Sequence, residues 1–152
     1  MSYDELLIES DHLKVTVKEM NLKLYDGLCV GNRIAIRKAI KTNTAKGCVL
    51  AEELGHYFYT IGDITDQTKL ENRKQEKLAR NWAYKKLVPL HKFIDIFNCG
   101  LRDRFEIAEY LNVTEEFLDD AIKYYKEKYG TYFEMDDYII YFEPNFGVLK
   151  MF

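Results

Sequence analysis

The sequence predicts an α+β fold in which a small sheet packs on helices in the first part of the chain, followed by shorter helices and a hairpin. Apolar and polar residues alternate over residues 13–17 and 27–37, as they do in half-buried strands. Residues 68–87 are rich in Lys, Glu, Gln, Arg and Ala and contain neither Gly nor Pro, which is typical of a long helix. The 152 residues are predicted to divide into a core at 1–89 and a subdomain at 90–152.

A helix, a strand and a hairpin are predicted first. Residues 3–9 have helical spacing of apolar residues, and the alternating Leu13, Val15 and Val17 indicate a strand after them. The turn of the hairpin is expected at residues 31–32, between short apolar runs of alternating pattern. These runs contain Leu28, Val30, Ile34 and Ile36.

Two long helices follow the hairpin. The side chain of Asn43 or Thr44 is expected to cap the first, and Gly62 is its expected C-terminal break. The second helix should end before Pro89, because the residue that precedes a proline is disfavoured in the helical conformation. The apolar stripe expected to bury this second helix consists of Leu78, Ala79, Trp82 and Leu87.

The C-terminal part is predicted to contain three shorter helices and a terminal hairpin. The helices are expected over residues 91–97, 105–111 and 115–129. The last two flank a tight turn, as in a helix-turn-helix, and Asn112 with Glu115 fits a capping box. The hairpin strands are expected at residues 138–142 and 148–152, with a turn near Pro144.

Charge and composition exclude several classes of protein. With 22 basic and 25 acidic side chains, the net charge of −3 creates no overall field that attracts nucleic acid. No apolar run approaches the roughly 20 residues of a membrane span, and the first residues lack the basic region of a signal peptide. A cytoplasmic protein is expected. Cys29, Cys48 and Cys99 lack CxxC spacing and are interpreted as small core residues, and His12 and His91 as surface residues.

The most informative segment runs from Leu50 to His56 and reads LAEELGH, an HExxH zinc-peptidase pattern with Glu52 in place of the first histidine. Residues four apart project from one helix face, so Glu52 and His56 can share a metal ion, while Glu53 is placed to polarise a water. An ordinary solvated helix face would also explain these residues. Residues 48–59 are apolar nearly all round, however, so these side chains should be buried and need partners such as a divalent metal.

A second segment, Gln75 to Pro89, reads QEKLARNWAYKKLVP and resembles the second signature of ImmA/IrrE metallopeptidases, roughly E-x-x-A-x-x-[FW]-A-x-x-x-L-x-P. The resemblance extends to the hairpin at residues 26–36 and covers most of residues 1–130. It implies a zincin-like core followed by a helix-turn-helix-like subdomain with a C-terminal hairpin. It also implies one zinc ion on Glu52, His56 and Glu76, with Glu53 as general base.

The glutamate at position 52 departs from the form with two histidines. A carboxylate is an acceptable zinc ligand, and three protein ligands leave a fourth position for water. Two carboxylates put more negative charge on the ion, which raises the pKa of its water and weakens its Lewis acidity. Oxygen ligands also make Mn²⁺ an alternative to Zn²⁺, and a site that has lost its metal is a further reading.

The resemblance implies an intracellular zinc-dependent endopeptidase that cleaves a phage-type helix-turn-helix repressor and so acts against repression. The alternative is a catalytically inactive protein that binds the repressor and sequesters it. Direct DNA binding is a third reading, but it is disfavoured, because the second helix of the helix-turn-helix opens with acids that repel phosphates. These acids are Glu115, Glu116, Asp119 and Asp120. A nucleic-acid partner is therefore not expected. A membrane partner is not expected either, because no apolar run is long enough to span a bilayer.

Three predictions concern the surroundings of the motif. The strand at residues 33–37 is expected to receive the substrate as an added strand. Asp63 and Asp66 lie between the two long helices, where a carboxylate could orient His56 through its outer nitrogen, although Asp66 is equally suited to cap the second helix. Tyr57 and Tyr59 are expected to pack.

Overall fold

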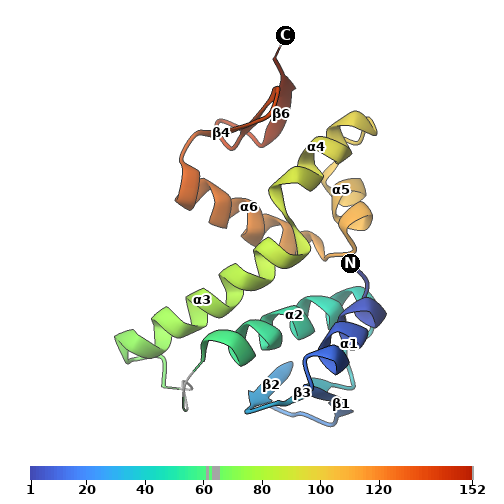
Figure 1. The fold of residues 1–152 in the computed structure, drawn as a ribbon, viewed down its shortest axis with the longest axis vertical. Helices are drawn as coiled ribbons and strands as arrows, with labels where there is room; N and C mark the ends of the chain where they lie inside the picture. Colours follow the sequence, from blue (N-terminus) through green and yellow to red (C-terminus); the bar gives the residue numbers. More distant parts are fainter. Residues whose placement is uncertain (61, 63–65, 152) are drawn as a thin grey trace. The chain divides into compact units, whose positions relative to one another are not determined.

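The computed structural model describes residues 1–60, 62 and 66–151, which form a mixed α+β fold (Figure 1). The predicted fold class is therefore confirmed. The chain comprises two compact units, Met1–Leu87 and Val88–Phe152, each of which has its own small sheet.

In its described residues, the first unit consists of a three-stranded sheet and three helices. Its elements are α1 (Tyr3–His12), β1 (Thr16–Met20), β2 (Gly27–Val30), β3 (Arg33–Arg37), α2 (Asn43–Tyr59) and α3 (Leu70–Leu87). The strand order is β1-β3-β2, with β1 parallel and β2 antiparallel to β3. The buried side chains of Ile34 and Ile36 lie on the face of β3 that packs on the helices. Helix α2 lies between this sheet and α3 (Figure 1).

The strand after α1 begins later than predicted. Leu13 caps the C-terminal end of α1, and Lys14 has a positive φ of 61°, so the chain turns where a strand was expected. Regular pairing begins at Thr16. Val15 is nevertheless only 4% exposed, which explains why its apolar pattern resembles that of a strand.

The ends of α2 also differ from the prediction. The N-cap is Thr42, whose hydroxyl accepts a hydrogen bond from the Ala45 amide at 3.1 Å, whereas Asn43 and Thr44 are already helical. A cap residue requires an extended backbone, and only Thr42 of these three has one. The helix ends at Tyr59 with Thr60 as its C-cap, before the expected break at Gly62.

Helix α3 packs on α2 through small residues, and this changes its predicted apolar stripe. A Cβ atom built on Gly55 would lie only 2.8 Å from the carbonyl carbon of Ala79, so the two backbones approach closely at this point. Ala79, Ala83 and Leu87 are buried as a result, but Leu78 is 50% exposed and was wrongly assigned to the buried stripe.

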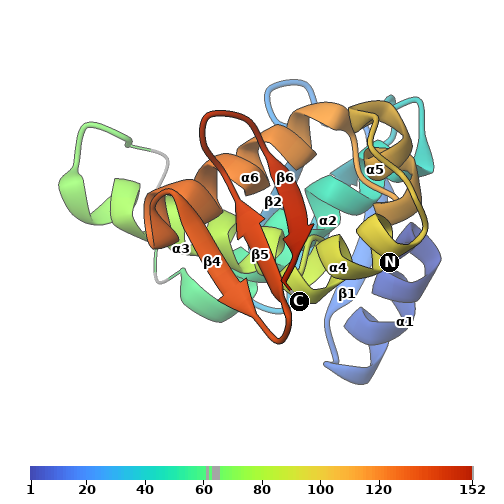
Figure 2. The ribbon, with the colours of Figure 1, turned by 90° about the horizontal axis from the view of Figure 1, so that it is seen from above.

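The second unit, as far as residue 151, contains three helices and an antiparallel sheet of three strands (Figure 2). Its elements are α4 (Leu90–Asn98), α5 (Arg104–Leu111), α6 (Glu115–Tyr129), β4 (Tyr132–Met135), β5 (Tyr138–Tyr141) and β6 (Gly147–Lys150). The predicted two-stranded hairpin lacked β4, which pairs with β5. The predicted capping box at Asn112 is also wrong, because Asn112 is the left-handed C-cap of α5 and Thr114 caps α6.

Helix length and the burial of the cysteine and histidine side chains test the expectations drawn from composition. Within the described ranges, no helix is both long and apolar enough to cross a membrane. Cys48 is buried, but Cys29 is only partly buried and Cys99 is exposed, so the interpretation of all three as core residues was wrong. His12 and His91 are exposed, as predicted.

Candidate metal and catalytic site

The close packing of α2 on α3 brings His56 and Glu76 together. The Nε2 atom of His56 lies 3.1 Å from Oε2 of Glu76, and its Nδ1 atom lies 2.7 Å from the hydroxyl oxygen of Thr60. Both side chains are largely buried, at 14% and 26% exposure. Two ligands at about 2.0–2.2 Å from one tetrahedral ion are roughly 3.4 Å apart, so this pair has a separation that suits a shared metal.

The charges of the site shift the pKa values of this pair in opposite directions. Hydrogen bonding to His56 lowers the pKa of Glu76, and Arg80 acts in the same direction. The Nε atom of Arg80 donates to Oε1 of Glu76 at 2.9 Å, one helical turn away on α3. Burial by itself would lower the pKa of His56, but its bond to Glu76 and the nearby carboxylates raise it.

Glu53 is the most deeply buried carboxylate of the motif and faces β2. It is 9% exposed, and burial raises its pKa from the usual 4.5 to about 7, with the nearby acids adding to the shift and His56 opposing it. A Cβ atom at Gly27 would lie 2.6 Å from Oε1 of Glu53 and 2.8 Å from a methyl carbon of Val49. The space that Glu53 occupies therefore exists because position 27 lacks a side chain.

Cys29, two residues farther along β2, also lies beside the motif helix. Burial and the charge of Glu53 raise the pKa of its thiol to about 11. The strand β2 thus places one glycine and one protonated thiol next to the buried carboxylate.

Glu52 lies on α2 and is partly exposed. Its charge acts on Glu53, His56 and Arg80, which places it in the same electrostatic cluster. Nowhere in the described part of the chain, however, are three or more His, Cys, Asp or Glu side chains arranged to hold a metal ion. The structure thus joins His56 to Glu76, with Glu53 on the same helix, but does not complete a set of three donors with Glu52.

Asp63 and Asp66, the two aspartates between α2 and α3, were predicted to orient His56 or to cap α3. Asp63 lies outside the described residues. Asp66 accepts hydrogen bonds from the amide and hydroxyl groups of Thr68, at 3.1 and 2.6 Å, in the turn that leads into α3. The outer nitrogen of His56 is instead paired with Thr60, a residue that the sequence interpretation missed.

Neither Arg80 nor Gly27 was predicted to have a role in the site, although both contact its carboxylates. Glu76 and Arg80 are four residues apart on α3, a spacing at which opposite charges pair, so their contact could have been predicted. Gly27 belongs to the hairpin that carries the family resemblance, but only the packing of β2 on α2 reveals its contact with Glu53. The ring of Tyr57 packs against that of Phe58, 5.1 Å between centroids, as expected for a packing residue. Tyr59 is 43% exposed, so the packing expected of it is only partial.

The prediction that the substrate pairs with the strand at residues 33–37 is wrong. The strand β3 is the central strand of its sheet and is paired on both sides, with β1 and with β2. It has no free edge for a further strand. The strand next to the motif helix that lies at an edge is β2.

Comparison with models of protein families gives a match to most of the chain. The family model Peptidase_M78, described as an IrrE N-terminal-like domain, matches residues 9–123. No curated protein and no solved structure gives a significant match to the chain. The matched range contains Glu52, Glu53, His56 and Glu76 together with the hairpin that precedes them.

Proposed function

The chain belongs to the Peptidase_M78 family of IrrE N-terminal-like domains, and from this membership we propose that it is a zinc-dependent endopeptidase. The observation that best supports the proposal is the pair formed by His56 and Glu76, which are 3.1 Å apart and lie on two closely packed helices. A buried carboxylate, that of Glu53, lies three residues before His56 on the same helix.

The ligands proposed for one zinc ion are Glu52, His56 and Glu76, with Mn²⁺ as the alternative metal. The chemistry of these donors fits either ion, since imidazole and carboxylate bind both. A bound ion would supply Lewis acidity toward the scissile carbonyl and lower the pKa of a water molecule. The hydrogen bond between Thr60 and Nδ1 of His56 orients the imidazole, which leaves Nε2 for the ligand role.

Glu53 is the proposed general base. It takes a proton from the attacking water and later delivers it to the leaving amine, which requires a carboxyl group with a pKa near the working pH. Burial raises the pKa of Glu53 to about 7 in the metal-free chain. Gly27 holds open the space in which this carboxylate lies.

The edge of β2 is the proposed binding site for the substrate backbone. Asp26 accepts a hydrogen bond from the Arg37 amide, so the backbone groups of alternate residues, Leu28 and Val30, face β3. The N–H and C=O groups of Gly27 and Cys29 therefore point to the free edge. An extended peptide bound there would run beside the motif helix and Glu53.

The proposed substrate is a helix-turn-helix repressor, and the chain would cleave it to relieve repression. The second candidate is a catalytically inactive protein that sequesters this repressor, and the lack of a completed set of three donors in the described residues favours testing it. The variant Glu53→Gln separates the two candidates. Repressor cleavage that disappears in this variant supports the peptidase, whereas repressor inactivation that survives supports sequestration.

Metal content provides the first test of the site. We expect about one zinc per chain in protein purified without chelator, lost in His56→Ala and in Glu76→Ala. His91→Ala and Glu71→Ala are matched controls, since both remove an exposed side chain of the same type. A folded chain that binds no zinc or manganese, or that keeps its metal in both site variants, would disprove the proposed ligand set.

A further inference from the structure

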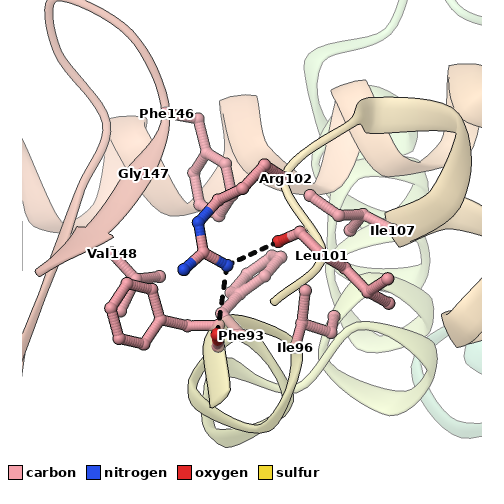
Figure 3. A pocket seen from close by; sticks show the side chains of 9 residues that line it. Phe93, Ile96, Leu101, Arg102, Ile107, Phe146, Gly147 and Val148 are labelled. Carbon is pink, nitrogen blue, oxygen red and sulfur yellow. Dashed lines mark hydrogen bonds between the residues drawn. The ribbon is translucent and has the colours of Figure 1, made fainter. Parts of the chain in front are cut away.

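The C-terminal unit contains a pocket that the proposed peptidase chemistry does not use. It has a volume of about 50 Å³ and lies between α4, the segment that leads to α5, α5 itself and the start of β6 (Figure 3). Its walls are aliphatic and aromatic, and a single arginine, Arg102, overhangs them. The wall residues include Phe93, Ile96, Leu101, Ile107, Phe146 and Val148.

The guanidinium group of Arg102 is held in place at this pocket. Its Nη1 atom donates to the carbonyl oxygen of Leu101 at 2.9 Å (Figure 3). The same atom donates to the carbonyl oxygen of Phe97 at 3.0 Å, and the Cζ atom lies 4.3 Å from the centre of the Phe97 ring. These contacts use one of the two terminal nitrogens. The Nε and Nη2 atoms make no hydrogen bond to any described residue, so they can bind a ligand without a rearrangement of the side chain.

The charge of Arg102 has no carboxylate partner among the described residues, although acids outnumber bases in this unit. Arg104 is paired with Asp119 and Lys126 with Glu143. Lys150 does not line the pocket: it is 5.9 Å from the centre of the Tyr138 ring, which packs edge-on against Phe97. The pocket therefore combines an apolar interior with one guanidinium group at its edge.

The size of the pocket limits what can enter it. A cavity known to take up a benzene ring has a volume of roughly 150 Å³, about three times the volume of this pocket. An aliphatic side chain such as leucine or valine can insert its terminal methyl groups. A carboxylate one residue away along a peptide, or at its C-terminal end, would then reach Arg102.

We propose that this pocket is a peptide-docking site, which receives one aliphatic side chain of a partner protein and binds the adjoining carboxylate through Arg102. Binding of such a segment depends on the pocket alone. A further role of the pocket, to bind the substrate at a point distant from its scissile bond, rests on the proposed peptidase function. The occupant is a protein segment, because a phosphate group alone would leave the apolar walls unused.

Titration of the full chain, observed through the NMR signals of its methyl groups, tests the docking site. The probe is N-acetyl-leucine, which has an aliphatic side chain beside a carboxylate, and N-acetyl-leucinamide is the neutral control. We expect shifts at the methyl groups of Ile96, Ile107 and Val148, and roughly five-fold tighter binding of the acid than of the amide. Inorganic phosphate should cause no shift at these methyl groups.

Two variants and one control locate the interaction. Arg102→Gln should remove the preference for the acid, and Val148→Phe, which fills the pocket, should abolish binding of both probes in a chain that stays folded. Lys123→Gln removes an equal charge from an exposed position on α6 and should change nothing. Equal binding of acid and amide by the parent chain would overturn the proposal. The proposal would also be overturned if the NMR signals shifted only for methyl groups outside the pocket, or if phosphate shifted those inside it. An effect of Lys123→Gln as large as that of Arg102→Gln would overturn it too.

The docking site and the peptidase function can fail separately. The titration is carried out after removal of metal with a chelator, so that it does not require an active site. For a chain that cleaves its substrate, Arg102→Gln should raise KM several-fold and leave kcat and zinc content unchanged, whereas an unchanged KM would overturn the docking role. If the parent chain cleaves nothing but binds N-acetyl-leucine as described, the peptidase proposal fails and the docking site stands.

Discussion

Replacement of Glu53 by glutamine should stabilise the metal-free chain while it removes peptidase activity. The carboxyl group is 9% exposed, and burial raises its pKa from 4.5 to about 7. At roughly 1.4 kcal/mol per pKa unit, ionisation of Glu53 lowers the free energy of unfolding by about 3 kcal/mol. Glutamine has nearly the same shape and cannot ionise, so it avoids this penalty.

The effect of Glu53 on stability depends on pH in a defined direction. Because the pKa is higher in the folded chain than in the unfolded one, the carboxyl group is protonated in both states below about pH 4.5 and the penalty is absent. The penalty grows as the pH rises from about 4.5 to about 7 and is complete above this window. The parent chain should therefore lose stability relative to Glu53→Gln as the pH rises.

Urea denaturation of the chelator-treated parent and variant at about pH 5 and about pH 8 measures this difference. The variant should be more stable by about 3 kcal/mol at the higher pH and by much less at the lower one. Glu71→Gln, at an exposed position of α3, is the control and should show no such difference. A Glu53→Gln variant that is no more stable than the parent at the higher pH would refute the reasoning.

Three further predictions concern the packing and titration of the site. Gly55→Ala should lower the free energy of unfolding by about 1–3 kcal/mol and weaken zinc binding, because α2 and α3 must separate to make room for the methyl group. Titration with urea measures the first effect and titration with zinc the second. Gly47→Ala, where the nearest atom would lie 3.7 Å from the added carbon, should have neither effect. Gly27→Ala should displace Glu53 and reduce kcat by about ten-fold or more at unchanged zinc content, and unchanged kcat would contradict the role of Gly27. Neighbouring carboxylates raise the pKa of His56, so zinc binding should release a proton from this side chain at mildly acidic pH and should weaken as the pH falls. Calorimetry in buffers of different ionisation enthalpy measures the number of protons released.

Local patterns of the sequence predicted the elements that carry the motif, but not their exact ends. The helix that contains Glu52 and His56 was expected because apolar residues recur with helical spacing around them. Its N-cap could not be assigned, since Thr42, Asn43 and Thr44 all have side chains that can cap a helix. The choice of Thr42 depends on which residue has an extended backbone, and this is set by the path of the chain from β3.

The features that the sequence did not reveal depend on contacts between distant segments. The hairpin at residues 27–37 was recognisable, but the parallel pairing of β1 with β3, which leaves β2 at the edge, involves strands that are not adjacent in the chain. The exposure of Leu78 likewise follows from the close approach of α3 to Gly55 on α2, which no pattern within α3 predicts. The strand β4 is an exception, because it pairs with β5 through a two-residue turn, and the turn residues Asp136 and Asp137 could have indicated this hairpin.

The surroundings of Glu52 also bear on whether a carboxylate can replace the first histidine of the motif. A zinc site with two histidines and one glutamate presents one negative charge to the ion, whereas Glu52, His56 and Glu76 would present two. Arg80 donates to Glu76 at 2.9 Å, and its own pKa reflects the charge of Glu52 as well as that of Glu76. One guanidinium group beside two carboxylates restores the net charge of the two-histidine site. The chain therefore contains, one turn after Glu76 on α3, the charge that an ion bound to this variant motif would need to keep its Lewis acidity.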